Sequence, residues 1–191
     1  MRTLEDLRAR LPESARDLKL NLQSVLSPAT LTPAQRLGVA VAAAASARNG
    51  ELLAALIVEA ERDAGGAVVD DALAAAALMG MNNVYYRFRH QVGKPSYSEK
   101  PTRLRMQRLA KPITNKLDFE LFSLAASTVN GCESCVRSHE RVVVEGGLTE
   151  DQVHDAVRLA ATIHGVAVAL DCASVLDAPR AAALVAGGTA A

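Results

Sequence analysis

Apolar residues recur along most of this chain at the spacing that places them on one face of a helix. Runs that alternate apolar and polar residues between turn residues, as strands do, are nearly absent. Thr32 followed by Pro33 is a typical helix start, and so is Thr149 before two acidic residues. The stretch Val92–Pro101, with a glycine and two prolines, is the one long loop expected. The pattern therefore predicts an all-α fold.

The sequence matches itself weakly at an offset of 81 residues. Ala44–Ser46 then falls on Ala125–Ser127, and the pair Asn49–Gly50 falls on Asn130–Gly131. The matched Asn-Gly pairs are turn residues, because both residue types adopt positive φ at low cost. Both copies are therefore expected to have the same layout of helix, turn, helix, turn and helix.

This repeat predicts one domain, residues 1–191, built from two helical halves at approximately 35–84 and 116–165 that share one core. The first copy also shows which residues the layout requires when it has no reaction to perform. Opposite the second-half residues Glu120, Cys132, Cys135 and His139 stand Val39, Glu51, Ala54 and Val58. The helical layout does not require these four second-half residues, so they are candidates for chemistry.

Composition and charge narrow the class of protein. Half of the residues are hydrophobic but only 3% are aromatic and Trp is absent, so the interior must consist mainly of Ala, Leu and Val in closely packed helices. The 21 basic and 21 acidic residues cancel, which leaves no overall field to attract nucleic acid or an anionic membrane. The basic residues Arg103, Arg105, Arg108 and Lys111 are interpreted as the solvated face of a helix.

Signals for export and membrane insertion are not found in the sequence. Met1–Leu11 carries charges where a signal peptide has an apolar run. No stretch approaches the ~18 uncharged apolar residues of a spanning helix. We therefore expect a soluble, cytoplasmic protein. In such a reducing compartment, a close pair such as Cys132 and Cys135 is catalytic or metal-binding more often than structural.

The candidate residues gather at one predicted helix start. Gly131 is expected to end a helix, which places Cys132 in the first turn of the next, where free amides and the helix dipole stabilise a thiolate. Cys135 lies one turn later on the same face, within range of a disulfide with Cys132. His139 continues that face and can take a thiol proton directly or through one water.

Glu120 is distant in sequence but is predicted to lie near His139. About eleven residues of helix lead from Glu120 to the turn and about eight lead back, or ~16 Å and ~12 Å at ~1.5 Å per residue. Antiparallel packing then brings the two side chains to similar heights. The apolar neighbours Phe119, Leu121 and Phe122 indicate a partly dry site, in which a carboxylate needs a partner such as an imidazole.

These residues resemble the signature of a known family. The alkyl hydroperoxidase D family has the same order and spacing as Glu120, Cys132, Cys135 and His139. The resemblance covers nearly the whole chain, because residues 11–22 (LPESARDLKLNL) and 79–87 (MGMNNVYYR) are also similar to that family. It implies an AhpD-like helical fold, within the wider carboxymuconolactone decarboxylase superfamily, and a homotrimer.

The resemblance also implies an antioxidant mechanism. Cys135 attacks a peroxide and becomes a sulfenic acid, which Cys132 resolves as a disulfide. Glu120 acts as the distant base through His139 and a water. The helix-end argument instead favours Cys132 as the more readily ionised thiol, so the sequence leaves open which sulfur attacks. Ser134 stands where many family members have His, which removes a second imidazole, and it is kept as a minor candidate.

No bound cofactor or metal is expected, and the implied partners act in trans. The resemblance implies electrons from dihydrolipoamide, delivered from NADH by dihydrolipoamide dehydrogenase and a lipoylated acyltransferase. It also implies that the pair reduces the peroxiredoxin alkyl hydroperoxide reductase C. A zinc site is less favoured, because it would need Cys172 together with a histidine. Cys172 is instead interpreted as a buried small residue, and His154 and His164 as hydrogen-bonded structural histidines.

Two other functions stay open. Carboxymuconolactone decarboxylase chemistry proceeds on the same helical superfamily by proton transfer without thiols, and the cysteine pair argues against it. A protein without enzymatic activity could use the pair to sense oxidation or zinc.

Three roles stay open for a polar and aromatic group in the middle of the chain, which consists of Asn82, Asn83, Tyr85 and Tyr86. The group lines a pocket, packs between helices or forms a trimer contact.

Overall fold

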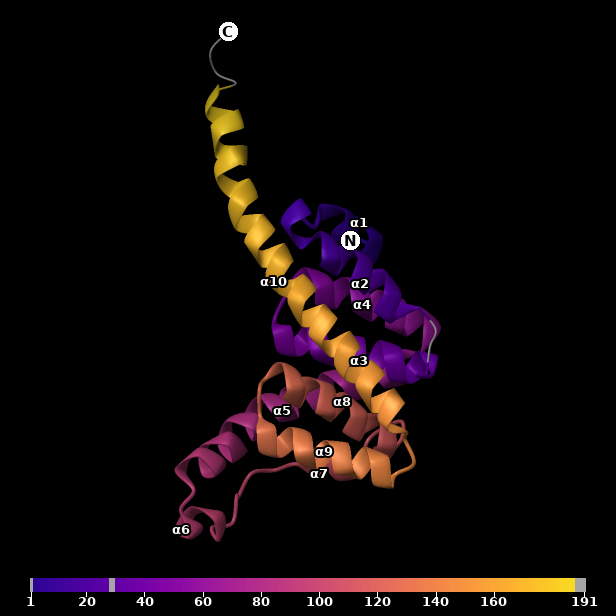
Figure 1. Cartoon of the computed structure of the whole chain (residues 1–191), viewed down its shortest axis with the longest axis vertical. Coiled ribbons are helices and arrows are strands. Elements are labelled where there is room, and N and C mark those ends of the chain that lie inside the picture. The colour runs from indigo at the N-terminus through magenta and orange to yellow at the C-terminus, as the bar shows by residue number, and fades with distance from the viewer. Residues whose placement is uncertain (1, 28–29, 188–191) are drawn as a thin grey trace.

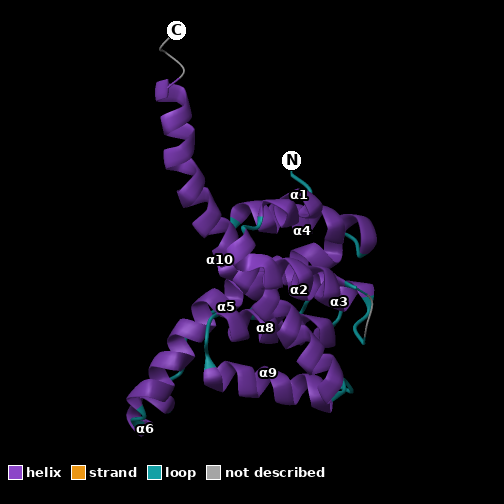
Figure 2. Cartoon of the chain, turned by 45° about the horizontal axis from the view of Figure 1, so that its top comes forward, coloured by secondary structure: helices purple, strands orange, loops and turns teal. Residues whose placement is uncertain are grey.

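The computed structural model describes residues 2–27 and 30–187, and its regular structure is helical (Figures 1 and 2). No strand occurs in those two ranges, which confirms the all-α prediction. The elements in chain order are α1 (Leu4–Arg10), the short 3-10 helix η1 (Glu13–Ala15), α2 (Arg16–Leu26), α3 (Pro33–Ala47), α4 (Gly50–Asp63), α5 (Gly66–Val92), α6 (Pro95–Ser98), α7 (Gln107–Ala110), α8 (Lys116–Val129), α9 (Glu133–Glu145) and α10 (Glu150–Gly187).

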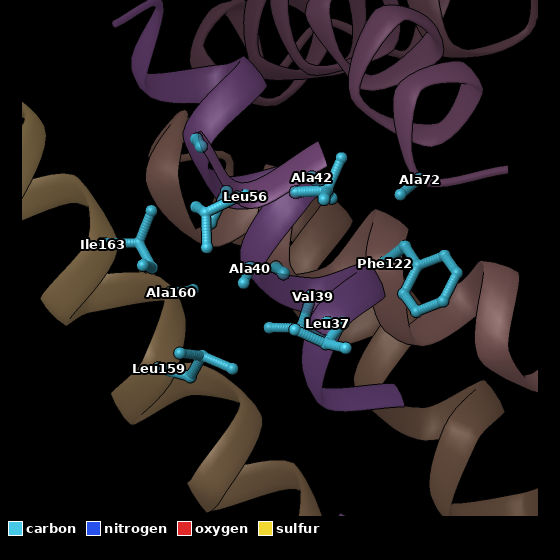
Figure 3. Close-up of a cluster of buried hydrophobic side chains, with 14 of the residues drawn as sticks. Leu37, Val39, Ala40, Ala42, Leu56, Ala72, Phe122, Leu159, Ala160 and Ile163 are labelled. Carbon is cyan, nitrogen blue, oxygen red and sulfur yellow. The ribbon is translucent and has the colours of Figure 1, made fainter. Parts of the chain in front are cut away.

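Helix α3 lies at the centre of the core. All its residues from 37 to 44 are buried, and it packs against α4, α5, α8 and α10. Figure 3 shows Val39 and Ala40 between Ile163 on α10 and Phe122 on α8. Small residues allow this close approach: a Cβ added at Gly38 would collide with the ring of Phe122. The Ala-rich composition therefore builds the closely packed helical interior predicted from the sequence.

The predicted helix starts are correct. Thr32 Oγ1 accepts from the Gln35 amide at 3.2 Å, while Gln35 Oε1 accepts from the Thr32 amide at 3.1 Å, with Pro33 at the first helical position. The same reciprocal contacts join Thr149 and Gln152 at the start of α10, at 2.9 Å and 3.2 Å. Each pair satisfies two amides that the first turn leaves unpaired.

The two predicted halves contain the same order of helices. Residues 35–84 span α3, α4 and most of α5, whereas residues 116–165 span α8, α9 and the first part of α10. Apolar residues of both halves belong to one buried cluster. The internal repeat and the single domain spanning 1–191 stay predictions. Parts of that span lie outside the described residues: 1, 28–29 and 188–191.

The connection between α5 and α8 differs from the prediction. The expected loop contains the single turn of α6, and irregular backbone continues beyond the loop to Met106. The next helix, α7, has only four residues. We call residues 99–114 the strap. Pro101 and Pro112 confine any helix in it to a short length, because proline and the residue before it disfavour a continuing helix. The helix-face interpretation is therefore wrong for Arg103 and Arg105, which lie in irregular backbone, and for Lys111, which follows the end of α7. Arg108 lies within the four residues of α7.

Helix α10 is apolar because it is a core helix. Residues Glu150–Val175 are long and apolar enough to cross a membrane, with a mean hydropathy of 1.4. In the structure 56% of that window is buried, and the helix packs against α2, α3 and α8. Its C-terminal part extends beyond the other helices (Figure 1). Burial of one face accounts for the apolar residues on that face.

The outer face of α10 corrects three predictions. Cys172 is exposed and is not a buried small residue. His154 and His164 are also exposed, so their interpretation as hydrogen-bonded structural histidines is wrong. These positions follow helical spacing on the side opposite buried residues such as Leu159 and Leu170. The apolar run made the whole helix resemble a buried one, although only one face contacts the body.

Candidate functional site

Cys132 and Cys135 form a disulfide at the amino end of α9. Cys132 is the N-cap residue of α9, one position before the first turn in which the sequence placed it. Cys135 lies within that first turn, and the two Cα atoms are 5.3 Å apart. Gly131 takes a φ of 66°, which ends α8 as predicted. The Cys132 amide donates to the Ser127 carbonyl at 3.1 Å and closes the turn. Both sulfurs therefore lie where the helix dipole stabilises an anion.

Glu120 on α8 and His139 on α9 contact each other inside the protein. Glu120 Oε2 lies 2.6 Å from His139 Nδ1, and their side chains are 6% and 12% exposed. Helices α8 and α9 lie side by side in both views (Figures 1 and 2). The prediction from helical rise, that the two reach similar heights, is confirmed. A buried carboxylate is costly without a partner, and the imidazole supplies one.

The contact with Glu120 links the proton on Nδ1 of the histidine to the charge of the carboxylate. When Glu120 is ionised it only accepts hydrogen bonds, and Nδ1 then carries the proton that it donates to Glu120. The other ring nitrogen, Nε2, lies 3.2 Å from Met79 Sδ. The pair can therefore hold a proton between Glu120 and the imidazole, and it can exchange a further proton at Nε2.

A cavity of about 360 Å³ lies beside the disulfide. Its described lining consists of Met79, Asn82, Tyr86, Met106, Leu109, Ser134, Cys135, Ser138 and His139. Cys135 is 6% exposed and lines the cavity, whereas Cys132 is 0% exposed and is not among these residues. A molecule in the cavity would meet Cys135 first, in a mainly apolar space that also contains the imidazole.

Comparison with known proteins identifies the family. A sequence model of the Carboxymuconolactone decarboxylase family matches residues 95–190, about half of the chain. A protein of Anaeromyxobacter dehalogenans (strain 2CP-C) named alkyl hydroperoxide reductase AhpD is 68% identical over 183 residues, 96% of this chain and 98% of that protein. The chain belongs to the carboxymuconolactone decarboxylase family.

Other relatives place the chain with the AhpD members of the carboxymuconolactone decarboxylase family. A protein of the same name from Gluconacetobacter diazotrophicus is 50% identical over 94% of this chain and 99% of that protein. Another from Brucella abortus (strain 2308) is 43% identical over 90% of this chain and 98% of that protein. The resemblance inferred from the sequence is thereby confirmed.

In this family member, polar residues of α5 support the turn before Cys132. Asn83 Nδ2 donates to Ser127 Oγ at 3.0 Å and Asn130 Nδ2 donates to Asn83 Oδ1 at 2.9 Å. Arg87 Nη1 donates to the Asn130 carbonyl at 2.7 Å. The group that the sequence left undecided therefore divides. Asn83 positions the turn, Tyr85 packs edge-on against Tyr86 with centroids 5.4 Å apart, and Asn82 and Tyr86 line the cavity.

Sequence reasoning missed Asp71, which fastens the strap over the cavity. Asp71 is fully buried and its carboxylate accepts from Arg108 Nε at 3.0 Å and from the Ile113 amide at 3.0 Å. It also accepts from the Thr114 amide at 2.7 Å and the Thr114 hydroxyl at 2.8 Å. Burial opposes ionisation, but the hydrogen bonds from Thr114 and Ile113 and the charge of Arg108 outweigh it and lower the pKa of Asp71.

The consequence of this anchoring is a fixed cavity wall. The strap contributes Met106 and Leu109 to the lining, on either side of Arg108. Asp71 was not predictable as an anchor, because its partners lie about 40 residues away in a segment whose regular structure is limited to the four residues of α7. The only signal was a pair of acidic residues, Asp70 and Asp71, in an otherwise apolar helical stretch.

The remaining candidates have smaller or unsupported roles. Ser134 lines the cavity, and its hydroxyl lies 3.7 Å from Cys132 Sγ, at the limit of a sulfur contact. Within residues 2–27 and 30–175, no group of three or more His, Cys, Asp or Glu side chains is arranged to hold a metal ion. Cysteines joined in a disulfide present no thiolate ligand.

Proposed function

We propose that this protein is an antioxidant thiol peroxidase and disulfide reductase that reduces alkyl hydroperoxides with Cys132 and Cys135. The observation that carries the proposal is a disulfide at the wall of an apolar cavity, beside a buried carboxylate and imidazole. The name alkyl hydroperoxide reductase, borne by relatives up to 68% identical, supports the choice of substrate.

Cys135 is the attacking sulfur in this proposal, because it lines the cavity and Cys132 does not. Its thiolate attacks the terminal oxygen of the hydroperoxide and the O–O bond breaks. The alkoxide leaves and is protonated to an alcohol, and Cys135 becomes a sulfenic acid. The thiolate of Cys132 then attacks that sulfur, a hydroxide leaves as water, and the disulfide forms. The disulfide in the structure corresponds to the end of this sequence.

Glu120 and His139 supply the proton transfers. His139 lines the same cavity as Cys135 and is held by Glu120 through Nδ1. We propose that the Cys135 thiol loses its proton through one water to Nε2, and that Glu120 balances the resulting imidazolium charge. The proton is returned to the departing alkoxide or hydroxide. Ser134 does not titrate near neutral pH and adds only a hydrogen bond.

The reductant and partners follow the same proposal. A second dithiol must reduce the disulfide by exchange, which suits dihydrolipoamide on a lipoylated acyltransferase, recharged from NADH by dihydrolipoamide dehydrogenase. The reduced pair would then also reduce the peroxiredoxin alkyl hydroperoxide reductase C. The setting is a homotrimer in the reducing cytoplasm.

Cysteine variants test the proposed roles. Cys135→Ser should consume no alkyl hydroperoxide, because no thiol lines the cavity. Cys132→Ser should consume about one equivalent and accumulate a sulfenic acid at Cys135, trapped by a sulfenic-acid reagent and located by mass spectrometry. Cys172→Ser is the matched control, because Cys172 is exposed on α10 and outside the site. Full activity in the Cys132→Ser, Cys135→Ser double variant would refute the proposal.

A coupled assay tests the electron donor. Oxidation of NADH is followed with lipoamide, dihydrolipoamide dehydrogenase and alkyl hydroperoxide, with and without the peroxiredoxin. The proposal expects peroxide-dependent oxidation of NADH that requires this protein and accelerates when the peroxiredoxin is added. Thioredoxin-dependent turnover without any lipoamide-dependent turnover would replace the donor but keep the peroxidase.

Decarboxylation of a lactone is the second candidate, because the matching family carries that name. It would use proton transfer by Glu120 and His139 without a sulfur step. Alkylation of both cysteines distinguishes the two reactions. Lactone decarboxylation that survives alkylation, in a protein without peroxidase activity before it, would favour this candidate.

A further inference from the structure

Met79 has polar contacts that are unusual for a thioether in an apolar cavity. Met79 is 1% exposed, and its sulfur lies 3.2 Å from His139 Nε2 and 3.7 Å from Asn83 Nδ2. Both contacts come from nitrogen atoms that can carry hydrogen. A thioether is a weak acceptor, so two such nitrogens are poorly used by the unmodified sulfur. An oxygen on this sulfur would be a strong acceptor for both.

The position of Met79 also brings it next to any peroxide in the cavity. Met79 lines the same cavity as Cys135. While the thiols are reduced, a hydroperoxide reacts with Cys135, because a thiolate is the better nucleophile. Once the disulfide has formed, no thiolate remains in the described lining. A second hydroperoxide that enters before reduction then meets two thioethers of the lining, Met79 and Met106. Of the two, Met79 has its sulfur 3.2 Å from His139 Nε2, next to an imidazole able to protonate the leaving oxygen.

We propose that Met79 is a peroxide-modified residue that arrests the enzyme when hydroperoxide exceeds the supply of electrons. The inference rests on the proposed function for the entry of hydroperoxide into the cavity. The Met79 sulfur attacks the terminal oxygen, the O–O bond breaks, and the products are methionine sulfoxide and one alcohol. The sulfur is oxidised by two electrons and the hydroperoxide is reduced by two, so no other reactant is required.

The sulfoxide changes what His139 can do. Its oxygen accepts a hydrogen bond from Nε2–H far better than the thioether sulfur does. Nε2 is then held as a donor while Nδ1 stays bonded to Glu120. The imidazole can no longer receive the proton of Cys135, so the relay stops although the disulfide can still be reduced. A methionine sulfoxide reductase would reverse the arrest.

Mass spectrometry tests the site of oxidation. The disulfide form is incubated with tert-butyl hydroperoxide without any electron donor, and tandem mass spectra follow the gain of about 16 Da at each methionine. We expect sulfoxide at Met79 to form about fivefold or more faster than at Met81, although exposure alone would favour the partly exposed Met81. Oxidation of Met81 before Met79 would overturn the proposal.

Activity measurements test the arrest. Each protein is exposed to hydroperoxide, freed of it, reduced and assayed against its own starting rate. Wild type and the control Met81→Leu should lose activity in proportion to sulfoxide at Met79, by about a hundredfold at completion, the typical loss for a missing acid–base step. Met79→Leu should keep its own starting rate. Loss of activity in Met79→Leu at the wild-type rate would refute the arrest.

These outcomes separate this inference from the proposed function. Fresh enzyme that turns over no hydroperoxide contradicts the peroxidase proposal, whatever happens at Met79. An active peroxidase whose Met79 stays unmodified contradicts only the inference. The Cys132→Ser, Cys135→Ser variant permits the mass measurement without turnover, and Met79 should still be oxidised first in it.

Discussion

Replacing Asp71 with Asn should release the strap from α5. The side chain keeps its shape but loses its charge, and one of its two oxygens becomes an amide group. If the amide replaces Oδ2, it faces the Thr114 amide and hydroxyl. If it replaces Oδ1, it faces Arg108 and the Ile113 amide. In either position it meets two donors. Each lost hydrogen bond to a charged group is worth about 1.5–3 kcal/mol. Because Arg108 is partly exposed and can regain water, we expect a loss of about 3–5 kcal/mol.

Asp70→Asn is the matched control. Asp70 is the neighbouring residue and also pairs with Arg108, but its side chain is 59% exposed. Exposed ion pairs contribute about 0–1 kcal/mol, so the control should change stability little. Urea unfolding of the reduced proteins, at one fixed protein concentration, measures the loss of stability in both variants. A difference of less than about 1 kcal/mol between the two variants would refute the role given to Asp71.

The same substitution should act on the cavity and on pH dependence. A detached strap should raise the KM for alkyl hydroperoxide by a larger factor than it lowers the rate at which Cys135 reacts with iodoacetamide. It should also allow trypsin to cleave after Arg103 and Arg105.

The pKa of Asp71 is lowered in the folded protein. Its contribution is therefore complete above the unfolded value of ~3.9 and is lost as the pH falls through the lower folded value. The stability difference between wild type and Asp71→Asn should shrink in that acid range.

Two further substitutions test the site and the core. Glu120→Gln leaves the His139 imidazolium without its counter-charge, so peroxide turnover should fall by about 10²–10⁴-fold, measured in a single-turnover reaction with titrated thiols. An unchanged rate would show that Glu120 is not needed. Gly38→Ala places a methyl group against the buried ring of Phe122, so it should cost about 1–3 kcal/mol or more in thermal unfolding, and an unchanged midpoint would contradict the packing described here.

Local and periodic features were predictable from the sequence. The helix starts at Thr32 and Thr149 depend on contacts within four residues, so their residue types suffice to predict them. The Glu120–His139 contact was predictable because one short turn joins two regular helices of known rise. The roles of these residues in a reaction stay predictions until they are measured.

Features that depend on distant contacts were not predictable. The strap is held by Asp71 from another helix, and its own sequence has no period that reveals this. The exposure of Cys172 depends on which face of α10 contacts the body, and hydropathy does not show this because apolar residues such as Val168 and Val175 also lie on the exposed face. Met79 belongs to residues 79–87, the segment that resembles the alkyl hydroperoxidase D family. Its contact with His139 was still not predictable, because it joins residues 60 positions apart.

The cavity has two unlike walls, and this limits what a fragment could do. Cys135 and His139 come from α9, in the second half of the chain, whereas Met79, Asn82 and Tyr86 come from α5, most of which belongs to the first half. A shortened protein with residues 95–190 alone would keep both thiols, the imidazole and the carboxylate. It would present them to bulk water, without the surface that confines a substrate. The first half thus supplies the wall that closes the cavity, and a protein without it would keep the thiols, the imidazole and the carboxylate but would lack an enclosed site for the substrate.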